Sequence, residues 1–90
     1  MNWIEIKKSI RESLMTRGLS NPRIRLKALD NIEDILRRLF PEYLQNPNET
    51  FGKTDKKLLK ESIAKHKPNG KLNDAESSVI NEIYYRIFII

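Results

Sequence analysis

An amphipathic stretch at 21–44 constrains the fold of this chain more than any other feature of its sequence. Apolar residues recur there at spacings of three and four, which places them on one side of an α-helix. These residues are Ala28, Leu29, Ile32, Ile35, Leu36, Leu39, Phe40 and Tyr43. A helix with one apolar side needs other elements to cover that side, so we expect the rest of the chain to be organised around this helix.

Local signals define both ends of this helix. Asn21, after Ser20, offers a side-chain acceptor for the N-cap, and Pro22 suits the first turn because its missing N–H costs nothing there. Pro41 is expected to kink or end the helix near Phe40, with a short extra turn after it. On the exposed face we expect two i,i+4 ion pairs, Glu33–Arg37 and Asp34–Arg38.

The flanking segments predict one further helix and one loop. The helix covers about 2–17, and its inner face is formed by Trp3, Ile6, Ile10 and Leu14. On the other side, 45–53 contains the run Asn-Pro-Asn and a glycine, which together predict the longest loop of the chain.

The second half of the chain predicts two helices joined by a turn at 68–70, which has the sequence Pro-Asn-Gly. The first opens at Thr54-Asp55 and is expected to turn Leu58, Leu59 and Ile63 inward. The second covers 73–90 and begins with a capping box, because an Asx cap is followed three residues later by a glutamate. The capping pair is Asn73 and Glu76.

Helix-length segments joined by short turns predict an all-α fold, an antiparallel bundle of about four helices in a single domain over 1–90. By propensity alone the β-branched and aromatic tail at 84–90 would suit a strand, but a lone strand has no partner, so we expect a helix there. This tail is apolar on more than one face, which predicts a protein interface and a homodimer. The candidate interface residues are Tyr84, Tyr85, Ile87, Phe88, Ile89 and Ile90.

Composition and motifs exclude several classes of protein. The chain contains no cysteine, which removes disulfides, thiolate metal ligands and thiol nucleophiles. Charged residues interrupt the apolar residues of 1–10, so we expect no secretory signal. No run approaches the roughly 20 apolar residues of a membrane span. These features favour a cytoplasmic protein.

The search for catalytic chemistry gives no candidate site. His66 is the single histidine, and no strand–turn–helix elbow places a serine near it. Asp30, Glu33 and Asp34 form the densest carboxylate cluster, but basic residues within one turn of them favour a solvated ion-pair face over a metal site. The three glycines form no phosphate-binding loop. We therefore expect a protein that is not an enzyme and holds no cofactor or metal.

The positive charge is concentrated in one segment. The net charge is +5, and 53–71 contains seven basic and two acidic side chains. Such a segment favours phosphates or an acidic protein surface, although a merely solubilising face is an equal alternative. Lysine is a point charge, so we expect contacts with the nucleic-acid backbone rather than with base edges. The candidate nucleic-acid-binding residues are Lys53, Lys56, Lys57, Lys60, Lys65 and Lys67, together with Arg23 and Arg25, and Lys71 completes the basic side chains of the segment.

Two resemblances extend this interpretation. The segment 16–24, with a glycine, an apolar residue and then a polar helix start carrying Arg23 and Arg25, resembles the turn of a helix-turn-helix motif, which implies DNA binding. The order of helices, the basic character and the pattern Lys-Leu-Asn-Asp-Ala-Glu at 71–76, followed by apolar residues, resemble the immunity proteins of pediocin-like bacteriocins. That resemblance implies a small cytoplasmic four-helix bundle that binds a protein partner, with specificity set by its C-terminal part.

Overall fold

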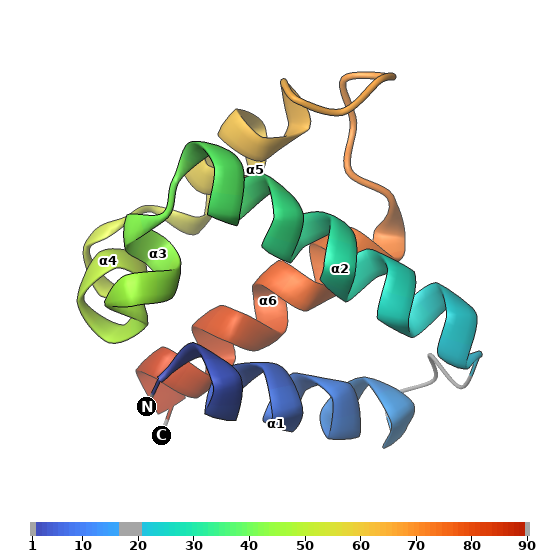
Figure 1. Ribbon diagram of the computed structural model, residues 1–90, viewed down its shortest axis with the longest axis horizontal. Helices are drawn as coiled ribbons and strands as arrows, with labels where there is room; N and C mark the ends of the chain where they lie inside the picture. The colour runs from blue at the N-terminus through green and yellow to red at the C-terminus, as the bar shows by residue number, and fades with distance from the viewer. Residues whose placement is uncertain (1, 17–20, 90) are drawn as a thin grey trace.

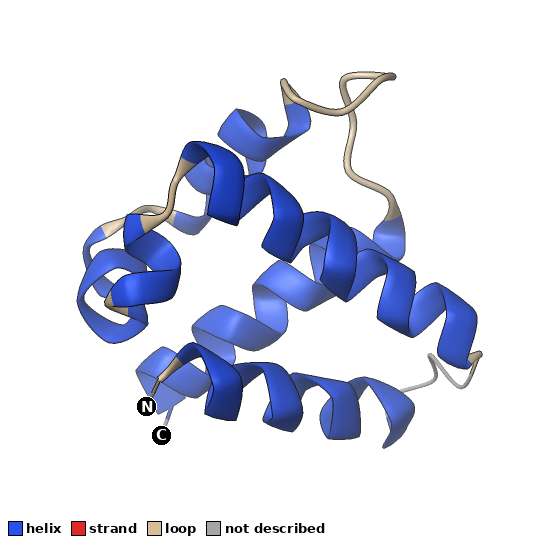
Figure 2. Ribbon diagram, in the orientation of Figure 1, coloured by secondary structure: helices blue, strands red, loops and turns tan. Residues whose placement is uncertain are grey.

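The computed structural model describes residues 2–16 and 21–89, and Figure 2 shows that all regular structure in these ranges is helical. The helices are α1 (Trp3–Thr16), α2 (Pro22–Leu39), α3 (Glu42–Gln45), α4 (Pro47–Lys53), α5 (Lys56–Ala64) and α6 (Asp74–Ile89). The all-α class is therefore confirmed, but the described part of the chain contains six helices where about four were expected. None of them combines the length and apolar character needed to cross a membrane.

The central element is α6. It packs against α1, α2, α4 and α5, and Figure 1 shows it passing between α1 and α2. Val79, Ile80 and Ile83 on α6 are fully buried, because a helix with apolar residues on more than one face needs cover from several sides. The apolar stripe of α2 is buried as expected, but the organising helix is α6 rather than the 21–44 stretch.

The stretch 21–44 is not one helix. The backbone N–H of Phe40 still donates to the carbonyl of Leu36 at 2.8 Å, and the chain then leaves the helical conformation before Pro41. The short helix α3 follows and buries Tyr43. Both the break at Pro41 and the extra turn after it are confirmed.

The expected loop at 45–53 is wrong, because this segment forms α4. Asn46 occupies the N-cap position and Pro47 the first turn, the same pair that starts α2 at Asn21. Phe51 fixes this helix to the core: its side chain is fully buried, and its ring lies 4.7 Å from that of Tyr43 and 5.7 Å from that of Tyr84.

The other helix starts agree with the sequence. The side chain of Asn21 accepts from the N–H of Arg23 at 2.9 Å. The side chain of Asp55 accepts from the N–H of Leu58 at 3.1 Å. At the start of α6 the capping box is complete, because the asparagine and glutamate side chains each accept the other residue's N–H, at 2.8 and 3.0 Å.

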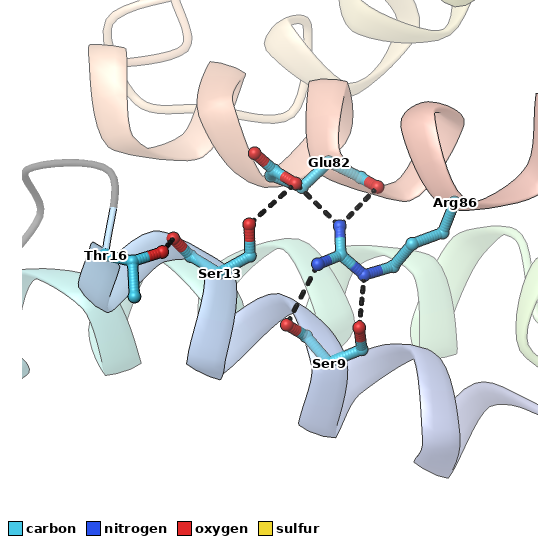
Figure 3. Close-up of polar contacts among 5 residues, drawn as sticks. All are labelled: Ser9, Ser13, Thr16, Glu82 and Arg86. Carbon is cyan, nitrogen blue, oxygen red and sulfur yellow. Dashed lines mark hydrogen bonds and ion pairs between the residues drawn. The ribbon is translucent and has the colours of Figure 1, made fainter. Parts of the chain in front are cut away.

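A buried polar network fixes α1 against α6 (Figure 3). The guanidinium of Arg86 donates to the carboxylate of Glu82 at 2.6 Å, to the hydroxyl of Ser9 at 2.6 Å and to the carbonyl of Ser9 at 3.0 Å. Ser13 donates to the same carboxylate at 3.1 Å. Because the later residue of α1 contacts the earlier residue of α6, the two helices run antiparallel. The Arg86 and Glu82 side chains are both more than nine-tenths buried, and these hydrogen bonds offset the free-energy cost of removing the two charges from water.

Glu33 joins α1 to α2 in a similar way. Both expected i,i+4 ion pairs of α2 form, at 3.4 Å for Glu33–Arg37 and 3.1 Å for the second pair. Glu33 is nevertheless buried rather than exposed, because Trp3 Nε1 donates to it at 2.5 Å and Lys7 Nζ at 2.9 Å. Burial raises the pKa of the Glu33 carboxyl, but these hydrogen bonds and charges outweigh it and leave the pKa below its ordinary value.

Phe51 and Phe88 provide a matched test of the position of α4. Phe51→Ala should lower the free energy of unfolding by roughly 3–5 kcal/mol, because it opens a cavity in the core. Phe88→Ala should cost roughly 1 kcal/mol or less, since that residue is 60% exposed and its ring stacks at the surface on the ring of Tyr84. Urea unfolding followed by circular dichroism measures both variants. Equal losses would contradict the burial of α4.

Candidate functional site

The basic segment is carried mainly by α5, which packs against α6. Leu59 and Ile63 are buried and determine which side of α5 faces the core. The expectation that Leu58 points inward is wrong, because its side chain is 61% exposed. The position of Leu58 lies about 100° around the helix from Leu59, on the solvent side.

Three lysines lie together on α5. Lys56 is four residues before Lys60 and Lys57 is three residues before it, so both side chains neighbour Lys60 on the helix surface. Lys60 is half-buried, and its Nζ donates to Oδ1 of Asn81 on α6 at 2.7 Å. Burial lowers the pKa of the Lys60 ammonium, and the charge of Lys56 lowers it further. The three ammonium groups therefore concentrate positive charge on one part of α5 and repel one another.

A fourth lysine approaches from the segment before α6. Lys71 and Lys60 line the same open groove of 340 Å³, whose other lining residues are Glu61, Ala64, Leu72 and Ser77. Lys71 follows Gly70, whose φ of 70° is a conformation that favours glycine. We call Lys56, Lys57, Lys60 and Lys71 the lysine surface.

Lys67 has a structural role instead. Its Nζ forms an ion pair with the fully buried carboxylate of Glu76 at 2.5 Å, and only 16% of its side chain is exposed. Asn31 of α2 donates to the same carboxylate at 3.2 Å. Burial raises the pKa of Glu76, but the hydrogen bonds from Lys67, from the backbone of Asn73 and from Asn31 outweigh it, so the pKa lies below its ordinary value. This cluster fixes the segment between α5 and α6, and with it the position of Lys71.

The remaining basic candidates are not part of the lysine surface. Lys53 forms an ion pair with Glu49 at 2.7 Å. Lys65, the exposed C-cap of α5, lies about 140° around the helix axis from Lys60. Arg23 and Arg25 lie at the start of α2. Figure 1 shows that α5 lies near the other end of this helix. Most of the turn of the helix-turn-helix resemblance, 17–20, lies outside the described residues.

The candidate interface on α6 divides into buried and exposed members. Tyr84 is buried, and its hydroxyl donates to the carbonyl of Thr54 at 2.9 Å. Burial raises the pKa of Tyr84 to about 12. Ile87 is half-buried, whereas Tyr85 is 45% and Phe88 60% exposed. The side chains of residues 89 and 90 lie outside the described part of the structure.

The single histidine lies just after the C-cap of α5. His66 is exposed, and its ring lies edge-on against Phe40 at 6.2 Å. Asp34 and Arg38 line a groove with it, but these two side chains pair with each other at 3.1 Å. Within 2–16 and 21–89 no three potential histidine, cysteine or carboxylate ligands come together around a metal position.

Comparisons of this chain with protein-family models, with curated proteins and with solved structures found no match.

The Glu76 cluster predicts acid sensitivity. Because the folded pKa of this carboxyl lies below its ordinary value of 4.5, the cluster contributes stability above about pH 4.5 that is lost as the pH falls through the folded value. Glu76→Gln should cost roughly 3 kcal/mol at pH 7, since it leaves Lys67 without its counter-charge, and should make stability less dependent on pH below 4.5. Urea unfolding between pH 7 and pH 3 measures both. The same pH profile in the variant and the original chain would contradict this role.

Proposed function

We propose that this chain is a small non-catalytic binding protein whose lysine surface holds the phosphate backbone of a nucleic acid. One observation carries the proposal: Lys60 of α5 and Lys71 of the segment before α6 line one groove, and Lys56 and Lys57 neighbour Lys60 on the surface of α5. Within the described residues, none of these four ammonium groups forms an ion pair with a carboxylate. Their positive charge is therefore available to an external anion.

Physical chemistry supports phosphate as that anion. Like charges at i,i+4, such as Lys56 and Lys60, cost a helix roughly 0.2–0.5 kcal/mol, and a bound anion would remove this cost. The net charge of +5 and the isoelectric point of about 9.6 would also draw a polyanion toward the protein. A lysine ammonium lacks the planar, bidentate donor geometry with which arginine binds base edges. The contact would therefore be with the phosphate backbone of the nucleic acid and independent of its sequence.

The salt dependence of binding tests the electrostatic contact. If four phosphates are neutralised, the logarithm of affinity should fall with the logarithm of salt concentration with a slope of about −3.6 for duplex DNA and about −2.8 for a single strand. For the duplex this corresponds to a loss of about 150-fold between about 50 and 200 mM salt. Fluorescence anisotropy with labelled mixed-sequence oligonucleotides measures the slope. Absence of binding to either at the lowest salt would contradict the proposal.

Charge reversal tests the location of the contact. Substituting glutamate for Lys56, Lys57 and Lys71 should abolish binding and leave the helical signal unchanged, because all three side chains are exposed. Lys60 is left in place because it contacts Asn81.

The matched control makes the same change in net charge elsewhere, through glutamate substitutions at the exposed residues Lys8, Arg11 and Lys27. It should retain most of the affinity, since only long-range attraction is lost. Equal losses in the two triple variants would show that net charge, rather than the lysine surface, controls binding.

A protein partner is the second candidate, in line with the immunity-protein resemblance. The observation that favours it is the exposure of Tyr85 and Phe88 near the C-terminal end of α6, where a second copy of the chain would cover them. Light scattering across a range of protein concentrations distinguishes this candidate: a mass that rises toward that of a dimer would support it, and a constant monomer mass would count against a homodimer.

A further inference from the structure

We infer that the lysine surface binds a single-stranded nucleic acid, whose bases stack on Tyr85 and Phe88 while its phosphates lie on the lysines. This inference rests on the proposed function, and it adds the class of nucleic acid and two binding residues. The packing of α5 along α6 brings the two groups of residues to the same side of the molecule.

Three contacts show that α5 and α6 run antiparallel, side by side. The last turns of α5 line a groove with Ser77, near the start of α6. In the middle of α5, Lys60 Nζ donates to Oδ1 of Asn81 at 2.7 Å. Just before α5 begins, the carbonyl of Thr54 accepts from the hydroxyl of Tyr84 at 2.9 Å. Residues earlier in α5 therefore lie beside residues later in α6.

From this packing we infer that aromatic side chains of α6 lie toward the first lysines of α5. Lys56 is one turn before Lys60, and Tyr85 is one turn after Asn81 on the same side of α6. Phe88 is three residues after Tyr85 and lies on the same side of α6. The rings of Tyr85 and Phe88 are 45% and 60% exposed. Asn81, Tyr85 and Phe88 therefore share one side of α6, the side from which Asn81 contacts Lys60 of α5.

The other aromatic residues lie in the interior or are half-buried. The chain has seven aromatic residues, all within the described ranges; Trp3, Tyr43, Phe51 and Tyr84 are buried, and Phe40 is half-buried. Phe88 is held in place by stacking on the ring of Tyr84, with the ring centroids 5.8 Å apart and an interplanar angle of 18°. The two exposed aromatic residues are therefore both on the side of α6 that carries Asn81, and Phe88 stacks on a buried tyrosine.

Lysines beside exposed rings match the chemistry of a single strand. Proteins that bind single strands without reading sequence combine positive charge along the backbone with aromatic rings on which bases stack. A duplex keeps the faces of its bases inside its own stack, so it would use only the lysines. The two rings therefore favour a strand with free bases.

The test compares a thymidine oligonucleotide of about 12 nucleotides with a duplex of the same length. Tyr85→Ala should weaken binding of the single strand by about fivefold or more, because a stacked base is lost, and should change duplex binding by less than about twofold. Phe88→Ala should act in the same direction. Tyr85→Trp keeps an aromatic ring and should retain single-strand affinity, which separates stacking from damage to the fold.

The outcomes distinguish this inference from the proposed function. Tighter binding of the single strand, lost in Tyr85→Ala and kept in Tyr85→Trp, is the expected result. If the original chain binds both oligonucleotides and Tyr85→Ala weakens neither, the inference is overturned while the proposed function stands. If the original chain binds neither oligonucleotide, both are overturned.

Discussion

Burial of α6 against four other helices holds this small fold together. Its apolar residues point to several sides, so α1, α2, α4 and α5 can each cover part of it, and α1 also packs against α2. The arrangement also puts charged groups inside. Arg86 and Glu82 face α1, where two serines supply the hydrogen bonds that water would otherwise make. The polar contacts fix the direction of α1, and the apolar contacts provide most of the driving force.

The same central helix positions the candidate site. Near its start, Glu76 holds Lys67 and thereby fixes the segment that carries Lys71. One turn beyond, Asn81 binds Lys60 of α5. Farther along, Tyr84 supports Phe88 from beneath. Groups from α5, from the segment before α6 and from α6 itself are therefore aligned on a rigid element, which limits the conformational entropy lost when a ligand binds.

Patterns that are local in sequence predicted much of the fold. The caps at Asn21 and Asp55 and the buried face of α1 follow from spacing alone. The helix α4 was missed because Asn-Pro serves both as a loop signal and as a helix start, and the burial of Phe51 that decides between them is a tertiary effect.

The site was predictable only in part. Spacing indicated the lysines of α5, but it gave no sign that Lys67 is neutralised by a carboxylate nine residues away across a turn. Nor did it show that Lys60 of α5 contacts Asn81 of α6, because that depends on how two helices pack. The most direct measurement is a titration of the ¹⁵N-labelled chain with a single-stranded oligonucleotide, followed by amide chemical shifts. Shifts concentrated at α5, Lys71 and the exposed end of α6 are the predicted result; shifts confined to the start of α2, or none, would contradict it.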